Sequence, residues 1–205
     1  MRLAIDIGGT FTDAVAITDD GRVFTAKSST TPSNLADGVI NAIRALDIAL
    51  EHVTSFIHGT TAGLNALLER RGANVALLTT KGFRDVYAIG RANRPELHNA
   101  RYKRPMPLVQ RPDIYEVNER KAADGSVLQP IRIEELVSLC KYSLANSYEA
   151  IAVCLLHSYK DSTHEREVRN ILTEELDGVP IILSSDVAPE WREYERTSTT
   201  VVSAY

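Results

Sequence analysis

The chain has 205 residues, 44% of them hydrophobic, which allows one large or two small domains around a buried core. The formal net charge of −4 excludes a general nucleic-acid binder, which would carry a basic stripe. No apolar run approaches the roughly 20 residues that a membrane helix needs, and we expect no signal peptide, because the apolar stretch at the N-terminus is short and is broken by Asp6. Cys140 and Cys154 lie in apolar segments, so we expect buried thiols, with neither a disulfide nor a metal site, in a cytoplasmic protein.

The first 30 residues predict a meander of three strands over residues 3–7, 12–18 and 22–27. A glycine pair separates the first two strands, and Asp19-Asp20-Gly21 is a strong hairpin signal between the second and third. A helix is expected to follow Asn34, with apolar residues at helical spacing as far as Leu50.

Further along, strands alternate with helices. Strands are expected over 55–58, 74–79, 151–156 and 181–183; helices are expected over 60–71, 134–144 and 164–176, with a last one from about Pro189. Residues 92–130, rich in Pro, Arg and Tyr, predict an irregular excursion with one strand over 114–117. This order predicts an α/β fold whose mixed sheet opens with the meander and is flanked by helices. A Rossmann unit would pass directly from its first strand into a helix.

We expect subdivisions at 1–91, 92–130 and 131–205. The apolar pattern continues to Tyr205 without a cap or polar tail, so we expect a truncated chain from a longer protein. Gly72 is expected to close the helix before it. The charged run 161–169 is expected to be a solvated helix face, and the basic run 94–104 a loop or a partner surface.

The turn within residues 6–13 is the main candidate for chemistry. Glycines let backbone N–H groups approach an anion, and threonines add hydroxyl donors. A carboxylate at Asp6 would repel a bound phosphate unless Mg²⁺ lay between them, and Asp13 is a second candidate metal ligand. The candidate phosphate contacts are Gly8, Gly9, Thr10, Thr12 and Asp13. Spacing alone leaves the alternative open that the glycines only join two hairpin strands, with Asp6 bonded to the turn.

The hairpin resembles the first phosphate motif of the superfamily of sugar and acetate kinases, heat-shock chaperones and actin. With the blocks 57–61, 78–85, 89–91, 152–159 and 193–205, the chain resembles the hydantoinase A/5-oxoprolinase family. That family includes N-methylhydantoinase A, ATP-dependent 5-oxoprolinase and the acetone carboxylase β subunit. One departure is Ala62-Gly63-Leu64, where the family more often has an apolar, small, Thr run.

The resemblance implies a ribonuclease-H-like fold and the N-terminal nucleotide-binding part of an ATP-dependent cyclic-amide hydrolase. It implies ATP and Mg²⁺ as cofactors, a cyclic amide as substrate, a second subunit or fused domain as partner, and an oligomer at full length. Asp6 and His58 are the candidate catalytic residues, His58 because its ordinary pKa lies near neutrality. Asp6 and Asp13 are the candidate metal ligands. The candidate substrate contacts are Thr60, Thr61, Asn65 and Arg91.

Several alternatives remain open. His58 can cap a sheet edge, with Thr60 or Thr61 as an ordinary N-cap of the following helix. The whole protein can belong to the acetone carboxylase branch, which acts on ketone and bicarbonate, or act as a sugar-type kinase. This chain can also be a folded module that is inactive alone.

Overall fold

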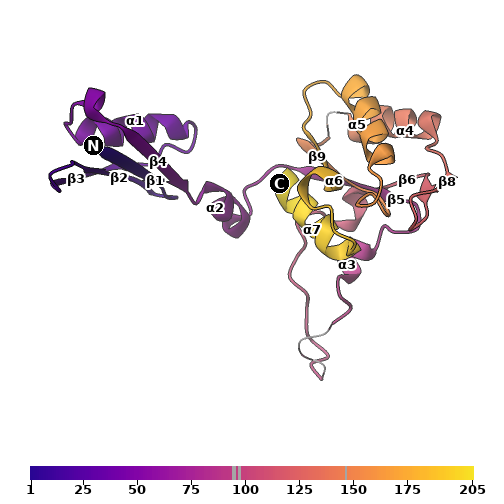
Figure 1. Cartoon of the computed structure of the whole chain (residues 1–205). Helices are drawn as coiled ribbons and strands as arrows, with labels where there is room; N and C mark the ends of the chain where they lie inside the picture. Colours follow the sequence, from indigo (N-terminus) through magenta and orange to yellow (C-terminus); the bar gives the residue numbers. More distant parts are fainter. Residues whose placement is uncertain (94–95, 97, 146) are drawn as a thin grey trace. The chain divides into compact units, whose positions relative to one another are not determined.

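The computed structural model describes residues 1–93, 96, 98–145 and 147–205, so the predicted loop 94–104 and excursion 92–130 lie partly outside the described residues. The chain forms two compact units, Met1–Arg71 and Gly72–Tyr205, each with its own sheet (Figure 1). Residues 72–91, which we had grouped with the glycine turn, belong to the second unit.

The first unit contains a mixed sheet in the order β3-β2-β1-β4. The predicted meander is confirmed: β1 (Arg2–Ile7), β2 (Phe11–Ile17) and β3 (Val23–Ser29) pair antiparallel. The fourth strand, β4 (Ser55–Thr60), runs parallel to β1 and forms the other edge of the sheet.

One face of this sheet is covered by α1 (Leu35–Ala45). The Asn34 side chain accepts a hydrogen bond from the backbone N–H of Ala36 and so caps this helix. Side chains from alternate strand positions meet α1 in a small core, which contains Leu3, Ile5, Ile7, Ala14, Ala16, Ala42 and Leu46. The helix is shorter than expected, because Asp47 has a φ of 50° and Leu50–His52 forms a separate 3-10 turn.

The last helix of the first unit is α2 (Ala62–Glu69), which follows β4. We expected Gly72 to end it, but the left-handed residue at the helix end is Arg70, with a φ of 58°. Gly72 instead lies against the end of the chain: a Cβ there would be 2.3 Å from the Tyr205 ring, and the Ala73 N–H donates to the Tyr205 carbonyl at 2.9 Å. The first and last residues of the second unit therefore lie side by side.

The second unit contains a parallel sheet in the order β10-β9-β5-β6. Its strands are β5 (Val75–Thr80), β6 (Ile114–Val117), β9 (Ala150–Cys154) and β10 (Ile181–Leu183). Both β5 and β9 are buried along their whole length, as expected for parallel strands covered on both faces. The structure is thus mixed α/β with one mixed and one parallel sheet, and β5 does not extend the first sheet.

Helices cover both faces of the parallel sheet (Figure 1). One face packs against α4 (Ile133–Leu139), its π-helical continuation Cys140–Leu144, and α5 (Thr163–Glu175). The other face packs against α7 (Glu193–Ala204). The remaining elements are α3 (Val86–Ile89), η2 (Arg111–Asp113), β7 (Arg120–Lys121), β8 (Val127–Gln129) and α6 (Ser184–Val187). Cys140 and Cys154 are buried and free, as predicted.

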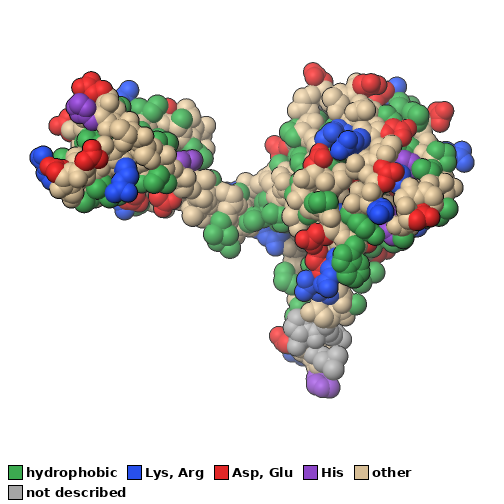
Figure 2. Space-filling view, viewed as in Figure 1, with side chains coloured by type: hydrophobic (Ala, Val, Ile, Leu, Met, Phe, Trp, Pro, Cys, Tyr) green, Lys and Arg blue, Asp and Glu red, His purple; other side chains and the backbone are tan. Residues whose placement is uncertain are grey.

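The surface carries no large field of one sign on the faces that Figure 2 shows, where acidic and basic side chains are interspersed. Within the described part of the chain, no helix is both long and apolar enough to cross a membrane.

Candidate phosphate and metal site

Hydrogen bonds to Phe11 and Thr30 fix the turn between β1 and β2. The Gly8 N–H donates to the Phe11 carbonyl at 2.9 Å, and a Cβ on Gly8 would lie 3.0 Å from that same oxygen. Thr30 bonds the turn twice: its N–H donates to the Thr10 carbonyl at 2.9 Å and its hydroxyl donates to the Gly8 carbonyl at 2.9 Å. Within the described residues, the N–H groups of Gly9 and Thr10 donate to no protein acceptor. The turn therefore offers two exposed donors on a fixed backbone.

Thr12 is fully buried, which separates it from the exposed part of the turn. Its hydroxyl lies 3.1 Å from the Thr30 hydroxyl, on the face that α1 covers. In this arrangement the hydroxyl contacts Thr30, which itself bonds the turn, and a contact of Thr12 with phosphate stays a prediction. The reason is strand alternation: Thr12 and Asp13 are neighbours in sequence and point to opposite faces of the sheet.

Asp6 and Asp13 occupy the uncovered face. They are directly opposite each other in the antiparallel register of β1 and β2. Like charges at such a pair destabilise a sheet. Lys27, opposite Asp13 on β3, relieves part of this repulsion with an ion pair at 3.1 Å, whereas Asp6 forms no ion pair with any described residue. Two facing carboxylates, one of them without a cation, favour binding of a positive ion between them.

The neighbour of Asp6 on its other side is Gly59, in register on β4. A Cβ on Gly59 would lie 3.5 Å from the Asp6 Oδ1, so glycine leaves the carboxylate uncovered. Among the described residues no group of three or more His, Cys, Asp and Glu side chains could hold a metal ion. Two carboxylates still suit Mg²⁺, which takes most of its oxygen ligands from water and phosphate.

The first turn of α2 lies beside the glycine turn. The Thr61 N–H donates to the Ile7 carbonyl at 3.1 Å, and the Asn65 amide nitrogen donates to the Thr61 hydroxyl at 3.2 Å. A Cβ on Gly9 would lie only 2.9 Å from that amide nitrogen, so Asn65 touches the turn itself. The Thr60 hydroxyl accepts a hydrogen bond from the Ala62 N–H at 3.1 Å, at the first residue of α2. The structure thus brings Thr60, Thr61 and Asn65 to the turn.

Two predicted residues lie elsewhere. His58 pairs in register with Ile5, so its side chain is on the α1 face, opposite to that of Asp6 and Asp13. It is exposed and stacks on Phe56 with ring centroids 6.5 Å apart. Arg91 belongs to the second unit, where it forms an ion pair with Glu195 at 2.6 Å. The proposed roles of both residues stay predictions.

A buried polar network, which the sequence did not reveal, lies where the parallel strands of the second unit end. Glu119 bonds the Thr80 hydroxyl and lies 2.6 Å from His164 Nδ1. Glu165 accepts from the Leu155 N–H at 2.9 Å and is fully buried. The charged run 161–169 is therefore not a solvated face, because part of it ties α5 to the strand ends.

His157 adds strain to the same region. It has a φ of 60°, and its Nδ1 is buried without a hydrogen-bond partner. Burial, with the nearby Arg196 and Arg120 charges, lowers its pKa, so the ring is held neutral.

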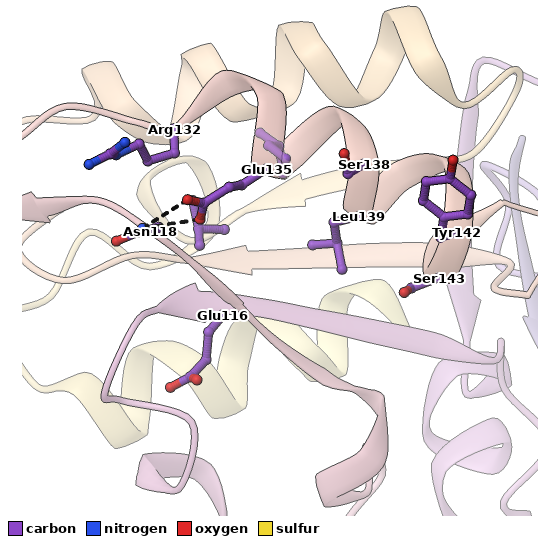
Figure 3. Close-up of a pocket in the computed structure, with 10 residues that line it drawn as sticks. Glu116, Asn118, Arg132, Glu135, Ser138, Leu139, Tyr142 and Ser143 are labelled. Atoms are coloured by element: carbon purple, nitrogen blue, oxygen red, sulfur yellow. Dashed lines mark hydrogen bonds between the residues drawn. The ribbon is translucent and has the colours of Figure 1, made fainter.

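A cavity of about 380 Å³ lies beside the end of β6 (Figure 3). Three of its polar side chains bond within the protein: Asn118 donates to both oxygens of Glu135, and Glu116 accepts from the Gly82 N–H at 2.7 Å.

The combination of a mixed α/β fold with a glycine turn and opposed carboxylates defines a candidate phosphate-binding protein. Residues 2–176 match the hydantoinase/oxoprolinase N-terminal region, and the chain belongs to that family. It is 37% identical to the acetophenone carboxylase gamma subunit of Aromatoleum aromaticum over 98% of this chain and 30% of that protein.

Two solved structures are similar over the whole chain. A nucleotide-free acetone carboxylase has a TM-score of 0.85 at 29% identity, with 32% of its chain covered. The ATP-dependent caprolactamase of Pseudomonas jessenii has a TM-score of 0.83 at 32% identity, with 31% of its chain covered. The chain thus spans about a third of the length of these relatives.

Proposed function

We propose that this chain is the nucleotide-binding N-terminal part of an ATP-dependent enzyme that opens a cyclic amide. The observation that carries the proposal is the opposition of Asp6 and Asp13 on an uncovered sheet face, beside a glycine turn whose N–H groups are exposed. The likeness to the ATP-dependent caprolactamase of Pseudomonas jessenii supports both ATP use and the amide substrate. We further propose that the first unit belongs to a ribonuclease-H-like lobe, because its meander continues into a parallel fourth strand.

In this proposal Asp6 and Asp13 hold Mg²⁺, and the N–H groups of Gly9 and Thr10 hold phosphate oxygens. Asn65 fixes the position of Gly9 from the α2 side. Bound Mg·ATP would supply a phosphoryl group that converts the amide oxygen into a better leaving group. The contribution of this chain is then positioning and charge neutralisation, on which phosphoryl transfer largely depends.

A second candidate is the carboxylase branch, favoured by the likeness to acetone carboxylase and to the acetophenone carboxylase subunit. Both chemistries use ATP to activate a carbonyl compound, so the site in the first unit fits both. The acetophenone carboxylase gamma subunit and the caprolactamase alpha subunit are both named as subunits, which supports a partner subunit or fused domain for this chain.

The test is ATP turnover by the complete protein with its partner, measured as phosphate release. Cyclic amides (5-oxoproline, hydantoin, caprolactam) are compared with acetone or acetophenone plus bicarbonate. We expect a cyclic amide to stimulate phosphate release, and Asp6→Asn to abolish the stimulation while Asp19→Asn keeps it. Stimulation by ketone plus bicarbonate alone would place the protein in the carboxylase branch. A stable phosphorylated product, or unchanged turnover in Asp6→Asn, would overturn the proposal.

A further inference from the structure

The second unit contains an open cavity of about 680 Å³, bounded by α3, α7 and the segment 102–108. Its volume is within the range of about 300–1,000 Å³ that is common for small-molecule sites. Its lining includes the arginines Arg91 and Arg104 and the rings of Tyr102 and Tyr194, and among the described residues that line it there is no Asp or Glu. The composition is therefore cationic and aromatic.

Arg104 is held rigidly with its charge unneutralised. Its guanidinium donates to three carbonyls: that of Ala88 at 2.8 Å, that of Ile89 at the end of α3, and that of Asn93 at 3.4 Å. No ion pair to Arg104 forms in the part of the chain that the structure describes. A guanidinium fixed by carbonyls loses little further side-chain entropy on binding an anion, and its remaining donors suit a carboxylate.

Arg91 already binds the carboxylate of Glu195, which an anionic ligand would have to displace or share. Its Nε donates to Glu195 on α7 at 2.6 Å, and this hydrogen bond lowers the pKa of Glu195. The terminal nitrogens of Arg91 form no hydrogen bond with other described residues. With these two nitrogens an arginine can donate two parallel hydrogen bonds to one carboxylate.

Gly90 keeps this corner of the cavity open. Its φ of 59° with a ψ of −139° is a conformation that other residues rarely adopt. A Cβ there would lie 3.4 Å from the Tyr194 ring and 3.8 Å from Arg104 Nη1, between the aromatic and the cationic walls. The buried Ser198 hydroxyl, at the same wall, has no hydrogen-bond partner. Pro105, Met106 and Val202 supply an apolar rim.

We propose that this cavity binds a small organic carboxylate with a flat or hydrocarbon body, with Arg91 and Arg104 at the carboxylate and the tyrosine rings along the body. Aromatic rings and arginines in one concave site favour such a ligand over an inorganic anion, which would leave the apolar wall uncovered. This proposal concerns the second unit alone and does not depend on nucleotide binding by the first.

The test is titration of the whole chain with 2-naphthoate, followed by amide NMR signals of Gly90 and Ser198. We expect saturable shifts that the neutral isostere 2-naphthamide and inorganic phosphate produce at least about tenfold more weakly. Arg91→Gln and Arg104→Gln should each weaken 2-naphthoate binding about tenfold, whereas Arg101→Gln, just before the segment 102–108 and outside the lining, should not.

A third variant distinguishes binding from a structural role. Glu195→Gln removes the competing carboxylate, so 2-naphthoate should bind more tightly than to the unaltered chain. If Arg104→Gln does not fold, Arg91→Gln and Glu195→Gln still test the proposal. Equal binding of 2-naphthoate and 2-naphthamide, absence of saturable shifts, or weaker binding in Glu195→Gln would overturn the proposal.

Discussion

Asp6 and Asp13 stand directly opposite each other on β1 and β2, and only Asp13 has a cation partner, Lys27. Facing carboxylates on adjacent strands repel each other, so this pair costs the isolated fold stability. A Mg²⁺ ion between the two carboxylates would attract both and so offset the loss of stability that their repulsion causes. The glycine turn and the Asn65 amide lie at the same end of the sheet, where a phosphate group could share the ion.

Replacing Asp6 should therefore stabilise the chain when no Mg²⁺ is present. We expect Asp6→Asn to raise the free energy of unfolding by about 0.2–1 kcal/mol in EDTA, because the cross-strand repulsion is removed. Urea unfolding followed by circular dichroism measures this. Asp19→Asn is the control, since Asp19 is exposed and lies away from this pair. Lower stability of Asp6→Asn in EDTA would show that Asp6 is held by attractive contacts.

Gly9 and Asn65 should be energetically coupled. A Cβ on Gly9 would approach the Asn65 amide nitrogen to 2.9 Å, so Gly9→Ala should push that amide away from the Thr61 hydroxyl and cost about 0.5–1.5 kcal/mol. Adding Asn65→Ala should recover much of that loss, which a double-mutant cycle measures. Gly63→Ala is the matched control: a Cβ there meets nothing within 4 Å, and the change should stabilise α2 by up to about 1 kcal/mol. Simple additivity of the two substitutions would refute the contact.

The pair Lys121–Asp161 should make the second unit sensitive to acid. Lys121 is almost completely buried, its Nζ lies 2.6 Å from the Asp161 carboxylate, and this bond lowers the pKa of Asp161. A lowered pKa in the folded state means that the carboxylate stabilises above the ordinary Asp pKa. That stability is lost as the pH falls through the folded-state pKa.

Asp161→Asn should accordingly lose about 1 kcal/mol at pH 7, because the buried ammonium keeps no charged partner while solvent screens the partly exposed carboxylate. The difference from the unaltered chain should shrink progressively below about pH 4. Urea unfolding at several pH values tests this, with Asp177→Asn as a control for a generic loss of charge. A difference that does not change with pH would argue against the ion pair.

Both thiols should resist modification in the folded protein. Burial raises the pKa of Cys154, and burial together with the Glu175 charge raises the pKa of Cys140 to about 11. The reactive thiolate is therefore scarce at pH 8. Reaction with Ellman's reagent should be slow without denaturant and should become fast in urea, at the concentration where the second unit unfolds. Fast labelling of the folded chain would contradict the burial of either thiol.

The sequence predicted the elements whose signals are local. The strands at 114–117 and 181–183 coincide with β6 and β10, and the meander followed from alternation and a hairpin turn. It did not predict that β5 pairs with β9 and β6 in a second sheet, separate from the sheet of β1 to β4. The choice of strand partner depends on residues that are distant in the sequence.

The candidate site was predicted only in part, again because strand pairing depends on residues that are distant in the sequence. Glycines and threonines identified the turn, but the faces of Thr12 and His58 depend on register: pairing of Asp6 with Gly59 places His58 on the other face. A shift of one residue would reverse that assignment. The burial of His164 depends on Glu119, which is 45 residues away in the sequence.

Titration of the chain with Mg²⁺ and ATP, followed by amide NMR signals of Gly9, Thr10 and Gly59, tests the role of the β1–β2 turn most directly. Binding is expected to be weak, because the chain spans only about a third of the length of its relatives. The predicted result is shifts at these three amides with Mg·ATP, smaller shifts with ATP in EDTA, and none in Asp6→Asn. The contradicting result is unchanged amide signals with Mg·ATP at millimolar concentration, or equal shifts in Asp6→Asn.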